Sequence, residues 1–489
     1  MKKKTFAIIL SIFMLMAFLT GCTNNATTSE LDNLDNSYND IELVENTELE
    51  GVEITFWHSM GGVNGQALDI LVEKFNAENE FGITVISEYQ GEYDDSLTKL
   101  KSAKLGDMGA DLVQIYDIGT KFMLESDWII PMEEIANLDS YDLTNIEPNI
   151  SAYYTVNGTL YSMPFNSSTP IMYYNKDMFE QAGITEIPKS LEEIKLIGED
   201  LLNKSDAQEV ISLSIYGWFF EQFICKQGLD YVDNDNGRNG YATKVVFDEN
   251  NSGESILTAW KELYDLGYTS NVGRGGSAGL TNFSAGKSAI TLGSTASLAQ
   301  ILQDVDGKFE VGTAYFPSVY SSDKGGVSIG GASLWALNNN DPAKLTATWE
   351  FTKFLISSEA QAYWSTQTGY FPVTITAQEE EIFKEALEKY PQLQTNLDQL
   401  HDSEAEYTGA LLSIFSEARA TVESEIENML NNNIEPSIVL QNITDNDILL
   451  LNPPESRVPA QGTRSLQGGA PRLSIRAIKP AQSCLPPLH

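Results

Sequence analysis

The sequence has few cysteines and few histidines. It contains three cysteines among 489 residues, and only Cys225 lies far from both ends of the chain. Three cysteines so far apart exclude a disulfide framework and the usual zinc-ligand spacings. The three histidines are also isolated, and His58 is expected to be a hydrogen-bonded residue at the end of a strand rather than a catalytic base. We therefore expect no metal site and no cofactor.

Positive charge is scarce as well. The chain has 30 lysines and arginines against 69 acidic residues, and its formal net charge is −39. Such a charge repels nucleic acid and anionic lipid, so neither is expected as a partner. Only Arg238, Arg274 and Arg419 precede residue 450, and the other four arginines lie in the last segment.

Sequence motifs that mark an enzyme are missing. There is no nucleophile elbow, no Walker loop and no spacing of metal ligands. A secreted glycosidase remains the enzymatic alternative, but 69 acidic residues make chance carboxylate pairs inevitable, so such pairs carry no weight. The sequence thus predicts a protein that is not an enzyme.

The two ends of the chain differ from its body. Residues 1–21 combine three lysines with an apolar run too short to span a bilayer, which predicts a signal peptide. The following Leu19-Thr-Gly-Cys22 resembles a bacterial lipobox, so Cys22 is expected to carry lipid on the outer face of the cell membrane. Residues 22–50 are polar and predict an unfolded tether. Residues 451–489, which lack acids after Glu455, predict a disordered, atypical tail.

The body alternates strand and helix patterns. Strands are expected over 52–57, 83–87 and 111–116, with helices over 66–79 and 94–104 between them. This order predicts α/β lobes with mainly parallel sheets, whose ligands bind beyond the carboxyl ends of the strands. About 400 residues exceed one core, so two lobes are predicted: 51–165 with 331–375, and 166–330 with 376–450. Phe165–Pro170 is the expected hinge crossing.

Several segments resemble the extracellular solute-binding proteins of ABC importers, family 1, the sugar and polyol class. They lie in one order between residues 52 and 430, and they are similar above all to members that bind glycerol 3-phosphate. The matching segments are Ile54-Thr-Phe-Trp-His-Ser-Met60, Phe75-Asn-Ala-Glu-Asn79, Gln114-Ile-Tyr-Asp-Ile-Gly-Thr120, Pro164-Phe-Asn-Ser-Ser-Thr-Pro170, Tyr173-Tyr-Asn-Lys-Asp177, Ile329-Gly-Gly-Ala-Ser-Leu-Trp335 and Thr368-Gly-Tyr-Phe-Pro372. The resemblance implies a type II periplasmic-binding-protein-like fold, two α/β lobes joined by a hinge.

The resemblance also implies a ligand site. Carried over residue by residue, the ligand-contacting positions are Tyr93, Asp117, Ser168, Trp218, Ser294, Gly331, Tyr370 and Arg419. Arg419 would bind phosphate through its planar fork, and Asp117 would accept from polyol hydroxyls. From spacing alone Arg419 could instead form an exposed ion pair with Glu423, and Asp117 could be a helix N-cap.

Function follows as an expectation. The chain would capture glycerol 3-phosphate or a related glycerophosphodiester as a monomer and deliver it to the ABC permease subunits in the membrane. A binding protein for a neutral sugar or oligosaccharide is the main alternative, and a surface adhesin is a further one.

Overall fold

The computed structural model describes residues 41–106, 109–404 and 407–451. The predicted signal peptide, Cys22 and the tail from residue 452 onward lie outside the described residues, as does the tether up to residue 40. In the described part of the chain, no helix combines the length and apolarity needed to cross a membrane.

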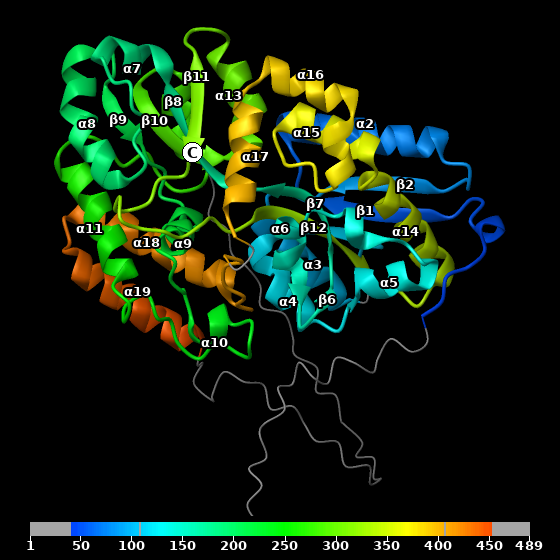
Figure 1. The fold of residues 1–489 in the computed structure, drawn as a ribbon. Coiled ribbons are helices and arrows are strands. Elements are labelled where there is room, and N and C mark those ends of the chain that lie inside the picture. The colour runs from blue at the N-terminus through cyan, green and yellow to red at the C-terminus, as the bar shows by residue number, and fades with distance from the viewer. Residues whose placement is uncertain (1–40, 107–108, 405–406, 452–489) are drawn as a thin grey trace, which may run out of the picture. The chain divides into compact units, whose positions relative to one another are not determined.

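A first sheet gathers the strands that begin and close the body. Its order is β2-β1-β3-β12-β4, and β7 pairs with the free end of β12. Helices α2, α14 and α15 pack together and against this sheet (Figure 1). The strands are β1 (Glu53–His58), β2 (Thr84–Tyr89), β3 (Leu112–Tyr116), β4 (Ile129–Ile130), β7 (Met163–Ser168) and β12 (Gly330–Leu337). The helices are α2 (Gly62–Glu78), α3 (Tyr93–Lys104), α4 (Thr120–Leu124), α5 (Met132–Asp139), α6 (Pro148–Tyr154), α14 (Pro342–Leu355) and α15 (Ser358–Thr368).

A second sheet has the order β11-β8-β10-β9. Its strands are β8 (Pro170–Asn175), β9 (Glu209–Ser212), β10 (Ser288–Ser294) and β11 (Val311–Tyr315). The helices between these strands are α7 (Lys176–Ala182), α8 (Leu191–Lys204), α9 (Gly217–Lys226), α10 (Asp233–Asn236), α11 (Ser252–Asp265), α12 (Ala278–Ser284) and α13 (Leu298–Val305).

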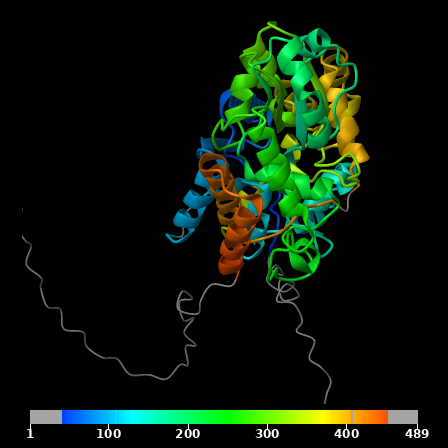
Figure 2. The same cartoon turned by 90° about the vertical axis from the view of Figure 1, so that its left-hand side faces the viewer.

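The C-terminal helices pack against elements of both sheets and their helices. They are α16 (Glu381–Lys389), α17 (Gln392–Asp402), α18 (Phe415–Asn432) and α19 (Pro436–Leu451). Helices α18 and α19, orange in Figure 2, lie side by side, and α18 packs on α9 and α11. The remaining elements are the short hairpin of β5 (Thr155–Val156) and β6 (Thr159–Leu160) and the 3-10 turns η2 (Asn46–Glu48), η3 (Asp117–Gly119), η4 (Leu143–Asn145), η5 (Thr295–Ser297) and η6 (Ile375–Glu379).

The chain passes from the first sheet to the second through a single residue. Strand β7 ends at Ser168 and β8 begins at Pro170, so only Thr169 separates them. Gln399 of α17 donates hydrogen bonds to the Thr169 hydroxyl at 2.9 Å and to the Pro170 carbonyl at 2.6 Å. The expected crossing over Phe165–Pro170 is therefore shorter than predicted, because β7 includes most of it. The lobe boundaries remain a prediction.

The α/β class is confirmed, but the strand directions differ from the prediction. β1 is parallel to β2 and β3, whereas β12 is antiparallel to β3, β4 and β7. In the second sheet β8 is antiparallel to both β10 and β11, and β10 is parallel to β9. Both sheets are thus mixed. β12 returns to the first sheet from the second, without the βαβ crossover that makes neighbouring strands parallel.

The end of the predicted tether belongs to the body. Leu49 is completely buried, and the backbone N–H of Val44 donates to the Thr346 hydroxyl at 3.0 Å. Leu43 also packs against the core. Residues 22–50 are polar on average, so these three apolar side chains did not stand out in the sequence. The prediction of an unfolded tether is therefore wrong for residues 41–50.

Candidate ligand-binding site

A cavity of about 230 Å³ opens where segments from both sheets meet. Seven of the eight predicted ligand-binding residues line it: Tyr93, Asp117, Ser168, Trp218, Ser294, Gly331 and Tyr370. Arg419 does not line it. Seven of the predicted positions thus share one cavity, and their role in ligand binding remains a prediction.

The strands explain why distant residues meet here. Asp117 follows β3 directly, Ser168 ends β7 and Ser294 ends β10. Carboxyl ends of strands gather ligand-contacting groups at one edge of an α/β sheet. The other lining positions come from the start of α3 (Tyr93), from α9 (Trp218), from β12 (Gly331) and from the loop after α15 (Tyr370).

Aromatic rings form the walls of the cavity. Tyr93 stacks on Tyr116 with ring centroids 5.3 Å apart, and its hydroxyl lies 3.4 Å from that of Tyr370. Asn166 donates to the Tyr93 hydroxyl at 3.0 Å, which fixes this ring. On the other wall Trp218 lies against β12, where a Cβ at Gly330 would come within 2.4 Å of the indole ring. Such faces suit the C–H groups of a polyol.

Small polar groups supply the hydrogen-bonding capacity. Ser168 is 2% exposed and lines the cavity. Ser294 is the N-cap of η5 and accepts from the Ala296 N–H at 3.2 Å. Gly331 has φ +90°, and a Cβ there would meet the Asn166 carbonyl oxygen at 2.1 Å. Glycine is therefore required at this position of the cavity wall.

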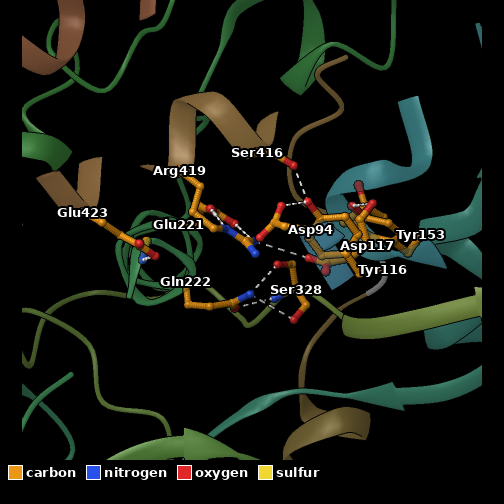
Figure 3. A network of polar contacts seen from close by, with 12 residues as sticks. Asp94, Tyr116, Asp117, Tyr153, Glu221, Gln222, Ser328, Ser416, Arg419 and Glu423 are labelled. Carbon is orange, nitrogen blue, oxygen red and sulfur yellow. Dashed lines mark hydrogen bonds and ion pairs between the residues drawn. The ribbon is translucent and has the colours of Figure 1, made fainter. Parts of the chain in front are cut away.

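Arg419 differs from both interpretations of the sequence. It is 7% exposed, so it is not a surface residue, and it does not face the cavity as a free cation. Its Nε and Nη2 donate to the two carboxylate oxygens of Glu221, each at 2.8 Å (Figure 3). Glu423, the expected alternative partner, instead accepts from the Gly217 N–H at 2.9 Å. Burial lowers the pKa of Arg419, but the charge and hydrogen bonds of Glu221 raise it more, so the net shift is upward.

Asp117 joins this network from the first sheet. Its Oδ2 lies 3.7 Å from Nη2 of Arg419. The pKa of Asp117 rises to about 7, mainly because the carboxyl group is buried. The charge of Arg419 lowers this pKa, and the charge of Glu221 raises it. The N-cap of η3 is Tyr116, so the alternative role of Asp117 as a helix cap is wrong. Asp117 can therefore be either a charged acceptor or a neutral donor near pH 7.

The hydroxyl of Tyr116, the residue before Asp117, makes further polar contacts. The Tyr116 hydroxyl donates to Asp94 at 2.5 Å and also contacts the Ser416 hydroxyl at the start of α18 (Figure 3). The Tyr153 hydroxyl donates to the Asp117 carbonyl at 2.9 Å. These bonds join the segment around Asp117 to α18, the helix that carries Arg419.

Sequence reasoning missed several residues of the site. The cavity is also lined by Asn64, Tyr116, Tyr216, Phe219, Gly276, Ser277, Leu280, Ala296 and Ser297. Glu221 was missed too, although one signal was present, because it is the sole acid in the mainly apolar helix α9. The serines lie in loops of ordinary composition, and no local pattern distinguishes them.

Metal and nucleophile chemistry find no support among the described residues. No group of three or more acidic, histidine or cysteine side chains could hold a metal ion there. Burial raises the pKa of the Cys225 thiol to about 12, so it does not form a thiolate readily. His58 accepts from the Met60 N–H at 3.2 Å, and burial lowers its pKa to about 4, as a strand-end structural residue requires.

The fold and the cavity between two sheets define a solute-binding protein. Residues 71–395 match the family described as bacterial extracellular solute-binding protein, and the chain belongs to this family. It is therefore a solute-binding protein of the kind that serves ABC importers, and not an enzyme.

Individual proteins similar to this chain include binding proteins for phosphorylated and for sugar-like ligands. The chain is 30% identical over 409 residues to the sn-glycerol-3-phosphate-binding periplasmic protein UgpB of Escherichia coli K12, covering 81% of this chain and 92% of that protein. The crystal structure of UgpB from Mycobacterium tuberculosis in complex with glycerophosphocholine gives a TM-score of 0.71 at 22% identity, covering 82% and 98%. The acarbose-binding GacH receptor of Streptomyces glaucescens gives 0.69 at 18%, also covering 82% and 98%. These structures confirm the type II fold.

Proposed function

We propose that this protein captures glycerol 3-phosphate or a related glycerophosphodiester outside the cell and delivers it to an ABC permease. The observation that carries this proposal is the cavity, where seven residues matched to ligand positions meet from distant parts of the sequence. The 30% identity to a glycerol-3-phosphate-binding protein supports the same ligand class. Hinge closure between the predicted lobes, with Thr169 at one crossing, would enclose the ligand.

The proposal includes a lipid anchor at Cys22. Its support is the lipobox-like Leu19-Thr-Gly-Cys22 after an apolar run. A chain with a net charge of −39 has no attraction to anionic lipid of its own, so a covalent anchor would keep it near the permease.

A neutral oligosaccharide remains the second candidate, and one observation favours it. None of the residues that line the cavity is a lysine, arginine or histidine. A phosphate there would be bound by hydroxyl and N–H groups, which serve a sugar equally well.

A thermal-shift screen of the purified protein separates these candidates. The ligands are glycerol 3-phosphate, glycerophosphoglycerol, glycerophosphocholine and maltotriose. A true ligand at a hundredfold excess over its Kd stabilises the folded state by about 2.7 kcal/mol. Stabilisation by a phosphorylated polyol supports the proposal, whereas stabilisation by maltotriose alone contradicts it.

A further inference from the structure

An irregular loop lies between α9 and α11 and includes the short α10 (Figure 1). Within it, residues 234–237 have positive φ angles one after another, from 52° to 74°. Left-handed backbone costs free energy in residues other than glycine, so it persists where other contacts hold it. The carboxylate of Asp233 accepts from the Thr243 N–H at 2.8 Å and from its hydroxyl at 2.6 Å, which fixes the base of the loop. We name residues 233–243 the Arg238 loop.

The guanidinium of Arg238 binds backbone on two sides. Its Nε donates to the Gly409 carbonyl at 3.0 Å and its Nη2 to the Thr408 carbonyl at 3.1 Å, both in the segment before α18. Its Nη1 donates to the Tyr153 carbonyl at 3.2 Å, and its central carbon lies 5.0 Å from the centroid of the Tyr153 ring. Tyr153 belongs to α6, which packs on β7 of the first sheet. The planar fork of Arg238 thus joins the two predicted lobes.

The Arg238 loop contacts the first group of elements a second time. The Nζ of Lys121 in α4 lies 4.6 Å from the centroid of the Tyr241 ring. The Lys121 side chain is 3% exposed and also pairs with Glu125 at 3.3 Å. Helix α4 directly follows η3, the turn that begins at Asp117. The loop therefore packs against a helix that adjoins Asp117 in the chain.

Tyr153 links Arg238 to the ligand cavity. Its side chain is 2% exposed, and its hydroxyl donates to the Asp117 carbonyl at 2.9 Å (Figure 3). Asp117 in turn lines the ligand cavity. A separate cavity of about 20 Å³ has Asp117, Tyr153, Asn236 and Gly409 in its wall, so the Arg238 loop lies close behind Asp117. Hydrogen bonds and packed side chains thus run without a break from Arg238 to the cavity wall, as energetic coupling between them requires.

We propose that Arg238 is a positioning residue, which binds α6 to the Arg238 loop and, through Tyr153, holds Asp117 in place at the wall of the ligand cavity. This inference rests on the proposed function. Arg238 does not line the cavity, so it acts on a ligand only through the residues between them. The left-handed backbone of residues 234–237 directs the guanidinium toward Tyr153. Without Arg238, α6 loses its bond to the loop and Asp117 loses its fixed position.

A double-mutant cycle tests this link by calorimetric titration with glycerol 3-phosphate and with glycerophosphocholine. Arg238→Met removes the guanidinium, and Tyr153→Phe removes only the hydroxyl that binds Asp117. Each should lower the affinity for the bound probe about tenfold. The double variant should also lose about tenfold rather than about hundredfold, because both changes break the same link.

Matched variants isolate the guanidinium from its charge. Lys244→Met removes a cation next to the Arg238 loop, from an exposed pair with Glu249 whose side chains are 44% and 59% exposed, and should change the affinity less than about twofold. Arg238→Lys keeps the charge, but an ammonium cannot reach three carbonyls as the fork does. Its affinity should fall between those of the wild type and Arg238→Met, and it replaces Arg238→Met in every comparison if that variant does not fold.

Hydrogen exchange of the ligand-free proteins tests the same link without a ligand. Arg238→Met should speed exchange of the amides in α6 and in residues 117–124 about tenfold, whereas Lys244→Met should leave them at the wild-type rate. A role of Arg238 confined to its own loop would change exchange only in residues 233–243 and in the segment around Gly409.

The outcomes distinguish this inference from the proposed function. Wild-type affinity in Arg238→Met, or losses that add in the double variant, overturn the inference and leave the proposed function standing. Wild-type exchange in α6 and residues 117–124 of Arg238→Met overturns it as well. If neither probe binds the wild type, the proposed function fails, and hydrogen exchange alone decides whether Arg238 holds α6 and Asp117.

Discussion

Removing the guanidinium of Arg419 should destabilise the fold itself. In Arg419→Met the carboxylate of Glu221 stays in place and loses both of its 2.8 Å hydrogen bonds. The Glu221 side chain is only 12% exposed, so water cannot replace the guanidinium fully. Breaking one partner of a buried ion pair costs about 3–5 kcal/mol. Whole domains are stable by about 5–15 kcal/mol, so the loss is large.

The double variant makes the test specific. Arg419→Met with Glu221→Leu removes both charges, and buried pairs replaced by apolar residues are often neutral in stability. We therefore expect the double variant to recover most of the loss. The control is Arg274→Met, which breaks the exposed pair of Arg274 with Glu427, side chains 42% and 31% exposed, and should cost less than about 1 kcal/mol.

Urea unfolding followed by circular dichroism measures five proteins: the wild type, the single variants Arg419→Met and Glu221→Leu, their double variant, and Arg274→Met. A loss below about 1 kcal/mol in Arg419→Met would contradict the reasoning. So would a double variant as unstable as the sum of its two single variants, because additivity means that the two side chains do not interact.

Three further predictions concern other parts of the chain. Gly331→Ala should lower the melting temperature by several degrees and weaken ligand binding, since φ is +90° and a Cβ would lie 2.1 Å from a carbonyl oxygen; unchanged values of both would refute this. Burial raises the pKa of Asp447 from 3.8 to about 7, so its contribution to stability is full below about pH 4 and is lost as the pH rises through 7. Asp447→Asn should remove up to about 4 kcal/mol of that decline. Urea unfolding at pH 4 and at pH 8 measures the decline in each protein, and an equal loss of unfolding free energy in the wild type and the variant would exclude this role of Asp447. Cys22→Ser should abolish labelling by radioactive palmitate and release the protein from the membrane fraction, whereas persistent labelling would rule out the proposed anchor.

Local patterns in the sequence predicted most elements but not their partners. The alternation over 52–116 matches β1, α2, β2, α3 and β3 within a few residues at each end. Strand direction in β12 could not be predicted in this way, because its neighbours depend on the path of the chain through the other sheet. Pairing between distant segments has no periodic signature.

Arg419 shows the same limit within the site. Helical spacing points to Glu423 one turn later, whereas the actual partner lies 198 positions earlier in the chain. The resemblance to a family correctly predicted that the other seven residues share one cavity. It carries information about the fold, which spacing along the chain does not. It did not reveal that Arg419 is already paired, because the pairing depends on Glu221, which lies in none of the matching segments.

Calorimetric titration with glycerophosphoglycerol shows whether this cavity binds a phosphorylated polyol. Wild type and Trp218→Ala are measured side by side, because Trp218 lines the cavity and lies against Gly330. We predict one ligand per chain for the wild type and an affinity at least about tenfold lower for the variant, a loss of about 1.4 kcal/mol. Equal affinities, or binding of maltotriose with none of glycerophosphoglycerol, would contradict it.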